Sequence, residues 1–170
     1  LAFDADMAVL PLLVAALGII SSVLGTFFVR SSEDANFGQL LWALRKGIIA
    51  SAVLVIVLSL AAVSYLDVSF DSFWAILSGL IAGIIIGFTT EFYTSYDYSP
   101  TKSVADASQT GAATNIIAGL ATGMQSTMIP VIVISLAIFV SFELLHFYGV
   151  ALAGVGMLST LGITLATDAY

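Results

Sequence analysis

Cysteine is absent from this chain of 170 residues, which excludes disulfide bonds and thiolate metal sites. Cationic side chains are almost as scarce, with four Lys and Arg against eleven Asp and Glu and no basic cluster. Because nothing in the chain could neutralise a phosphate backbone and release its counterions, we expect no nucleic-acid partner.

Charge of either sign is rare. Only 9% of the residues are charged, whereas a soluble domain carries about 25%. Apolar residues make up 60% of the chain, and the mean hydropathy is +1.12. Since so few polar groups cannot cover a water-facing surface, the composition predicts an all-α polytopic protein whose main partner is the lipid bilayer.

Five apolar runs are close to the roughly 20 residues that a helix needs to cross the hydrocarbon core. The runs are Met7–Val29, Gly47–Leu66, Phe73–Phe92, Gln125–Leu144 and Gly149–Asp168. We expect the helices that contain them to cover about residues 7–29, 40–66, 72–93, 102–144 and 149–168, in a single membrane-embedded piece covering 1–170.

The orientation of these helices follows from the cations, because cytoplasmic loops hold the excess of Lys and Arg. All four cations fall on one predicted side: Arg30, Arg45, Lys46 and Lys102. The opposite side has none. We therefore expect the chain to start outside and to finish, at Asp168, on the cytoplasmic side.

The predicted fourth helix is unusually long. If it is continuous from Lys102 to Leu144, it measures roughly 64 Å at about 1.5 Å per residue, about twice the bilayer thickness. Pro130 is expected to kink it. Small residues recur at four-residue spacing in the third helix and in or just before the apolar part of the fourth, which favours close helix packing, either within the chain or at a subunit interface. They are Gly79, Gly83 and Gly87, then Gly111, Gly119 and Gly123.

Acids inside a membrane are costly, so each was placed against the predicted spans. Nine lie at helix ends or in loops and are read as solvated: Asp4, Asp6, Glu33, Asp34, Asp67, Asp71, Asp97, Asp106 and Glu143. Glu91, at the inner end of the third helix, could face a cavity or the interface. His146 stands alone on the outer side, where one histidine makes neither a metal site nor a proton relay.

Asp168 differs because of its neighbours. Counting back by helical turns, Asp168, Thr164 and Thr160 share one face of the predicted fifth helix, with Ser159 and Thr167 at its edges. Such a polar stripe suits a water-filled cavity that opens to the cytoplasm. The alternative is that the hydroxyls bond back to their own helix and the acid merely ends the span. One carboxylate without a nearby cation cannot bind a multiply charged anion by itself.

Three motifs in fixed order resemble the membrane-integral pyrophosphatases, ion pumps driven by hydrolysis of inorganic pyrophosphate. They are TEFYTS at 90–95, SVADASQTGAATNIIAGLATGMQSTMIPV at 103–131 and GVALAGVGMLSTLGITLATDAY at 149–170. In that family the motif ending in DAY continues into a Gly-Pro turn and a stretch rich in Asn and Gly, before which this sequence stops at Tyr170. The resemblance therefore implies an internal piece, with Leu rather than Met first, that is inactive alone.

The resemblance implies a homodimer with sixteen helices per subunit, of which this chain supplies about the seventh to the eleventh. The fifth helix here would belong to an inner ring around a catalytic cavity open to the cytoplasm, and the long fourth helix to the subunit interface. Asp168 would join an acidic cluster that holds Mg²⁺ and pyrophosphate. Potassium or sodium would be further cations, and the other site residues would lie on the remaining segments of the same protein.

Two other classes of protein stay open on the residues alone. The first is a non-enzymatic secondary transporter or channel, in which the Ser/Thr stripe lines a pathway and Asp168 binds a cation. The second is a purely structural membrane subunit.

Overall fold

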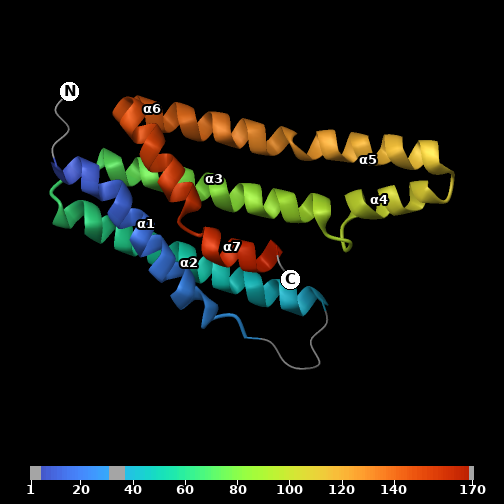
Figure 1. Ribbon diagram of the computed structural model, residues 1–170, viewed down its shortest axis with the longest axis horizontal. Helices are drawn as coiled ribbons and strands as arrows, with labels where there is room; N and C mark the ends of the chain where they lie inside the picture. Colours follow the sequence, from blue (N-terminus) through green and yellow to red (C-terminus); the bar gives the residue numbers. More distant parts are fainter. Residues whose placement is uncertain (1–4, 31–36, 169–170) are drawn as a thin grey trace. The chain divides into compact units, whose positions relative to one another are not determined.

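The computed structural model describes residues 5–30 and 37–168. Within these residues the chain forms only helices, and the all-helical fold class is confirmed. The helices are α1 (Ala5–Thr26), α2 (Phe37–Tyr65), α3 (Asp71–Thr94), α4 (Ser99–Ser108), α5 (Ala112–Ser126), α6 (Met128–Leu158) and α7 (Leu161–Asp168), as labelled in Figure 1.

Four helical stretches of the described chain are long and apolar enough to cross a membrane: Met7–Thr26, Gly38–Tyr65, Asp71–Ser108 and Ala112–Leu158. The first three begin within three residues of the helices expected from the sequence. The predicted fifth span, 149–168, is divided between the end of α6 and the short helix α7.

The chain divides into two compact units. Unit 1 is built from both ends of the chain, residues 1–83 and 137–170, and unit 2 from the middle, residues 84–136. Helices α3 and α6 each begin in one unit and end in the other.

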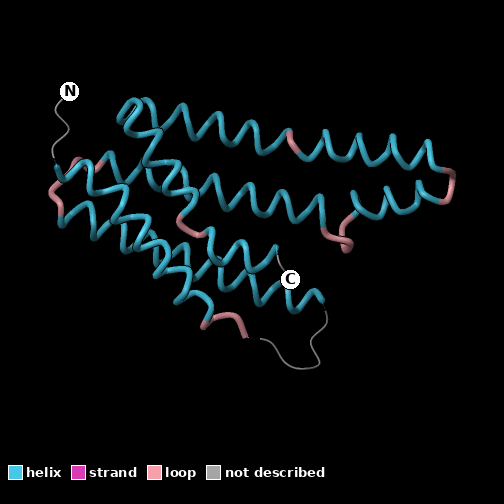
Figure 2. The backbone as a smooth tube through the Cα atoms, in the orientation of Figure 1, coloured by secondary structure: helices cyan, strands magenta, loops and turns pink. Residues whose placement is uncertain are grey.

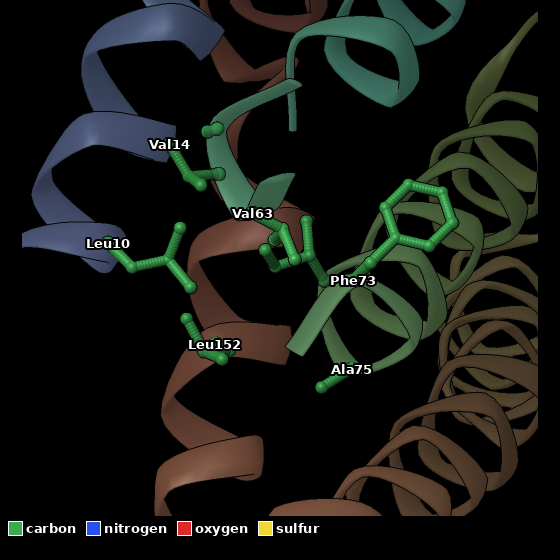
Figure 3. Close-up of a cluster of buried hydrophobic side chains, with 8 residues drawn as sticks. Leu10, Val14, Val63, Phe73, Ala75 and Leu152 are labelled. Atoms are coloured by element: carbon green, nitrogen blue, oxygen red, sulfur yellow. The ribbon is translucent and has the colours of Figure 1, made fainter. Parts of the chain in front are cut away.

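Unit 1 has a packed core to which four helices contribute. Leu10 of α1, Val63 of α2, Ile76 of α3 and Leu152 of α6 are each at most 2% exposed. Figure 3 shows the Leu10, Val63 and Leu152 side chains converging between their helices. Between helices in lipid there is no water to expel, so this core is held by close van der Waals packing and by hydrogen bonds between helices.

Small residues let the backbones of unit 1 come into contact. A Cβ added to Gly79 would overlap the backbone carbonyl of Ala153, and one added to Gly156 would overlap the carbonyl of Ile76. Helices α3 and α6 therefore touch through two glycines, one on each helix. The internal-packing interpretation of the glycine spacing is thus correct for Gly79.

Unit 2 contains a helical hairpin in which α4 and α5 pack against each other (Figure 2). The expected continuous helix over 102–144 is wrong, because the chain reverses between Ser108 and Ala112. The turn includes Gly111 with φ 132° and ψ 165°, a backbone conformation that residues with a Cβ rarely adopt. The polar residues before Gly111 end α4, and α5 starts afresh after it.

Pro130 acts one turn before its own position. It has no N–H to bond the carbonyl of Ser126, and the helix is interrupted at Thr127, between α5 and α6. The sequence predicted a kink in the membrane half of this helix, and the observed irregularity lies at its beginning.

A second reversal occurs inside α6, within unit 1. Leu145 and His146 leave helical geometry, and His146 takes φ 51° and ψ −139°. Gly149 then packs directly on the carbonyl of Ser141, a contact that leaves no room for a side chain. The Tyr148 hydroxyl donates to the carbonyl of Met7 at 2.6 Å and so ties the turn to the start of α1.

Candidate functional site

The candidate site is built on α7, which starts at a break in the last membrane segment. Helix α6 ends at Leu158 and α7 begins at Leu161, so Ser159 and Thr160 lie between two helices. The Ser159 hydroxyl donates at 2.6 Å to the carbonyl of Gly156, in the last turn of α6. Hydroxyls that compete for backbone groups in this way weaken a helix locally, and Gly162 lowers helix propensity further.

The break lies well inside the span. Residues 147–158 make about 18 Å of helix, against a hydrocarbon thickness of about 30 Å. A backbone group left without a partner at that depth costs several kcal/mol. The carbonyl of Ser159 accepts a hydrogen bond from the Ser22 hydroxyl of α1 at 3.3 Å, and both residues are buried.

Helix α1 packs tightly along this junction. A Cβ on Gly18 would come within 2.8 Å of the Ser159 carbonyl oxygen, and one on Gly162 within 3.1 Å of the Ser22 Cβ. Gly18 and Ser22 are one turn apart on α1, and Ser159 and Gly162 are about one turn apart across the break. The two segments therefore run in the same direction.

Because α7 runs in the same direction as α1, the end of unit 1 at which Asp168 lies can be identified. A Cβ on Gly47 would meet side-chain atoms of Val29 and of Ile163, so the beginning of α2, the residues just after α1 and the middle of α7 meet. The last turn of α7, which ends at Asp168, therefore lies at the end of unit 1 that carries the cations. These are Arg30, Arg45 and Lys46.

Two of the hydroxyl residues predicted to share a polar face with Asp168 lie at the start of α7. Thr160 is 4% exposed and sits in the break, whereas Thr164 is partly buried in α7 and donates back to the Thr160 carbonyl at 3.0 Å. A groove of about 450 Å³ between α1 and the α6–α7 junction includes Ser22, Ser159 and Gly162 in its lining, and not Thr160 or Thr164. Ser159 and Thr164 thus agree with the alternative interpretation of the polar stripe, in which each hydroxyl bonds a backbone carbonyl three or four residues earlier in the chain.

Asp168 is the last residue of α7, and its side chain lies outside the described residues. Among the side chains that are described, no three His, Cys, Asp or Glu gather as a metal cluster.

Glu91 and His146, the two remaining candidates, lie apart from α7 in the chain. Glu91 is partly buried near the end of α3 in unit 2, where its backbone carbonyl accepts from the Ser95 N–H at 2.9 Å. His146 is exposed at the reversal inside α6, with its ring 5.3 Å from that of Phe142. Within unit 1, His146 is not among the residues that line the groove at the α6–α7 junction.

Unit 2 has a hollow of its own, about 590 Å³ in volume, between the end of α3, α4 and α5. Most hydroxyls around it are bonded within their own helices, such as Ser108 to the Ala105 carbonyl and Ser126 to the Gly123 carbonyl. Asn115 Oδ1 is enclosed there, with no hydrogen-bond partner among the described residues.

Sequence reasoning missed the contribution of Ser22 and Gly18. Both lie in the first helix, 137 residues or more from the junction that they contact, and neither belongs to a recognisable motif. The available signal was the succession of small residues in α1, from Gly18 through Ser21 and Ser22 to Gly25, at helical spacing.

Comparisons with known proteins agree over the whole chain. A family model described as "Inorganic H+ pyrophosphatase" matches residues 1–170. The chain is 43% identical over 173 aligned residues to a "Putative K(+)-stimulated pyrophosphate-energized sodium pump" of Bacteroides thetaiotaomicron, covering 94% of this chain and 23% of that protein.

A second relative is the "K(+)-insensitive pyrophosphate-energized proton pump 2" of Moorella thermoacetica, 41% identical over 181 aligned residues, with 99% of this chain and 26% of the relative covered. A proton pump of the same description from Chloroflexus aurantiacus is 35% identical, with 99% and 24% covered. The chain thus spans about a quarter of the length of the curated relatives that it matches.

Proposed function

Since this chain belongs to the inorganic H+ pyrophosphatase family, we propose that it serves in a membrane-bound pyrophosphatase that couples hydrolysis of magnesium pyrophosphate to transport of protons or sodium ions. Its relatives are named as pumps for one ion or the other, so the proposal covers both. None of the relatives compared is named as a non-enzymatic transporter or channel, and that alternative gains no support.

The observation that carries the proposal is the family match over all 170 residues, which includes the α7 segment ending at Asp168. The sequence motifs that led to the same family cover both units, so the assignment does not depend on one short region. The whole protein would be an enzyme in which this chain's residues supply a scaffold and one part of the site.

The chemistry of Asp168 fits a magnesium site in one respect. A carboxylate oxygen is the hard ligand that Mg²⁺ prefers, and Mg²⁺ usually binds through one or two carboxylates together with substrate phosphates and water. When bound, the ion would neutralise charge on pyrophosphate and on the departing phosphate. The other ligands would come from segments of the same protein outside the described residues.

The residues of this chain would orient that carboxylate. Helix α7 is short, so the position of its last residue depends on how its first turn is held against α1 and α2. Thr160 and Thr164 would assist by fixing the start of the helix, since the Thr164 hydroxyl bonds the Thr160 carbonyl, just before the first residue of α7. Glu91 stays a secondary candidate for the cavity wall.

The catalytic side is proposed to be cytoplasmic. The end of unit 1 towards which α7 runs also holds Arg30, Arg45 and Lys46, and Lys and Arg concentrate on the cytoplasmic side of membrane proteins. Potassium and sodium are proposed as further cations, because the relatives' names include a K⁺-stimulated sodium pump. A homodimer is proposed from the family resemblance, with the α5–α6 segment near the subunit interface.

The test is Asp168→Asn in the full-length protein, with Asp106→Asn as the matched control. Asparagine keeps the size of Asp168 and removes its charge, whereas Asp106 is an exposed carboxylate in α4. We expect pyrophosphate hydrolysis and ion pumping to fall together by at least about 100-fold for Asp168→Asn, the scale of losing one preorganised electrostatic group. Both activities should persist in Asp106→Asn.

Excess magnesium should restore little activity to Asp168→Asn, because ligand geometry is lost along with affinity. Hydrolysis at a near wild-type rate in that variant would show that Asp168 is only a helix end. Hydrolysis and pumping are measured on the same membrane vesicles. The amount of the variant protein in those vesicles is measured with an antibody, so that low expression is not mistaken for low activity.

A further inference from the structure

We propose that Ser22 of α1 is a positioning residue for the site at the end of α7. Its hydroxyl holds the backbone at the α6–α7 break and thereby sets the place of Asp168. The inference rests on the proposed function of Asp168 as a ligand of magnesium pyrophosphate, and it adds a residue to which no motif or relative's name points.

Ser22 touches both sides of the break. Its hydroxyl donates to the carbonyl of Ser159, the residue that follows α6, at 3.3 Å. Gly162, in the first turn of α7, faces the Ser22 Cβ so closely that an added methyl group would stand 3.1 Å from it. One small side chain therefore fixes the end of α6 and the beginning of α7 together.

Burial gives this hydrogen bond its importance. Ser22 and Ser159 are each 5% exposed, so water does not replace the donor readily if it is removed. The surrounding groove is lined mainly by apolar side chains of α1, α6 and α7. In such surroundings, removing a hydrogen-bond donor from a backbone carbonyl at a helix break costs free energy.

A small movement at the break becomes a larger one at Asp168. Six residues separate Gly162 from Asp168, which is about 9 Å along a helix. A tilt of about 10° at the start of α7 would displace its last residue by about 1.5 Å, beyond the roughly 0.5 Å within which a metal-binding constellation must be held. Ser22 thus acts through Asp168 and has no contact with the reacting groups in this proposal.

The chain offers a matched control in the neighbouring residue. Ser21 is also buried, at 0% exposure, but its hydroxyl donates to the carbonyl of Leu17 in the same helix at 2.7 Å. Ser21→Ala and Ser22→Ala remove the same buried oxygen from the same helix, and only Ser22→Ala removes a bond to the break.

The experiment measures magnesium binding without turnover in the full-length protein. Thermal unfolding is followed while Mg²⁺ is titrated at a fixed concentration of imidodiphosphate, a pyrophosphate analogue that is not hydrolysed. We expect Ser22→Ala to raise the Mg²⁺ concentration for half-maximal protection about tenfold, the lower end of the effect of removing a residue that orients a ligand. Ser21→Ala should keep the wild-type Mg²⁺ requirement.

A double-mutant cycle shows whether Ser22 acts through Asp168. In the Asp168→Asn background, Ser22→Ala should leave the already weakened Mg²⁺ dependence unchanged, because the ligand that it positions is gone. If Ser22→Ala does not fold, Ser22→Cys keeps the size and a weak donor and should give a smaller shift in the same direction.

Two outcomes are distinguishable. If Asp168→Asn weakens Mg²⁺ protection but Ser22→Ala behaves like Ser21→Ala, the positioning role is wrong and the proposed function stands. If Asp168→Asn itself keeps the wild-type Mg²⁺ dependence, the proposed role of Asp168 is wrong and the role of Ser22 is lost with it.

Discussion

The two units of this chain are held together in different ways. Unit 1 encloses fully buried side chains from four helices, and its backbones touch through glycines. In unit 2 every residue from 84 to 136 is described, and not one is buried. Its α5 helix instead exposes large apolar side chains such as Ile116, Ile117 and Leu120, each at least 66% exposed.

The difference teaches where each unit obtains its stability. Unit 1 has a buried core of its own, so the position of α7 can be derived from contacts within the chain. Unit 2 presents an apolar surface that only lipid or other protein can cover. The site on α7 therefore rests on the unit that has a buried core, and the exposed apolar side chains of both units are suited to contacts with lipid or other protein.

The largest expected effect on stability comes from comparing substitutions at two glycines of α3, one in each unit. Gly79→Leu would drive a side chain into the backbone of Ala153, whereas Gly87 has open space around it. We expect Gly79→Leu to destabilise the full-length protein by about 3 kcal/mol or more and Gly87→Leu by less than about 0.5 kcal/mol. Equilibrium unfolding in mixed detergent measures both.

Equal destabilisation by Gly79→Leu and Gly87→Leu would remove the contrast. It would show that the open face of α3 in unit 2 is packed as tightly in the whole protein as the face in unit 1.

A smaller effect on folding and a specific effect on assembly are expected at Gly123. No atom lies within 4 Å of where its Cβ would be, so Gly123→Leu should leave the fold intact. If unit 2 is covered by a second copy of the protein, the added side chain should wedge the copies apart. Native mass spectrometry and crosslinking of the full-length protein measure the dimer fraction.

An unchanged dimer fraction in folded Gly123→Leu would mean that lipid, or another part of the same chain, covers this face. The exposed apolar surface would then need no subunit partner at this position.

The prediction with the smallest expected effect on the fold concerns the side of the membrane that one loop of each unit faces. Single cysteines at Ser69 of unit 1 and Gln109 of unit 2, both exposed, should leave the fold unchanged. The cation distribution predicts that Ser69→Cys faces outside and Gln109→Cys faces the cytoplasm. Membrane-impermeant maleimide applied to sealed vesicles of a cysteine-free protein should label them from opposite faces. Labelling from one face would make the predicted topology wrong.

Much of unit 1 could be predicted from the sequence, because apolar runs of membrane length report directly on α1, α2 and α3. The turn at His146 also falls between two predicted helices. These features depend on local composition, and a periodic pattern or a change in polarity marks them.

The turns in unit 2 and the break before α7 could not be predicted from the same signals. Thr110 and Gly111 interrupt a polar stretch that reads equally well as helix, and the reversal depends on α5 packing back on α4. Ser159 and Thr160 lie in an apolar run, and the hydrogen bond from Ser22 that accompanies the break joins residues 137 positions apart. Propensity carries no information about such distant partners.

Unit 1 is closed by contacts between the two ends of the chain, and this has a consequence for its synthesis. Ser22 bonds Ser159 across 137 residues, and Tyr148 bonds Met7 across 141. At ribosomal rates of about 5–20 residues per second, α1 would wait about 7–30 s for these partners after it emerges. During that interval α2 is the neighbour within unit 1 that can already pack against α1. Folding of this unit is therefore late and of high contact order, and a translocon or chaperone that holds α1 in the membrane would lower the chance of mispairing.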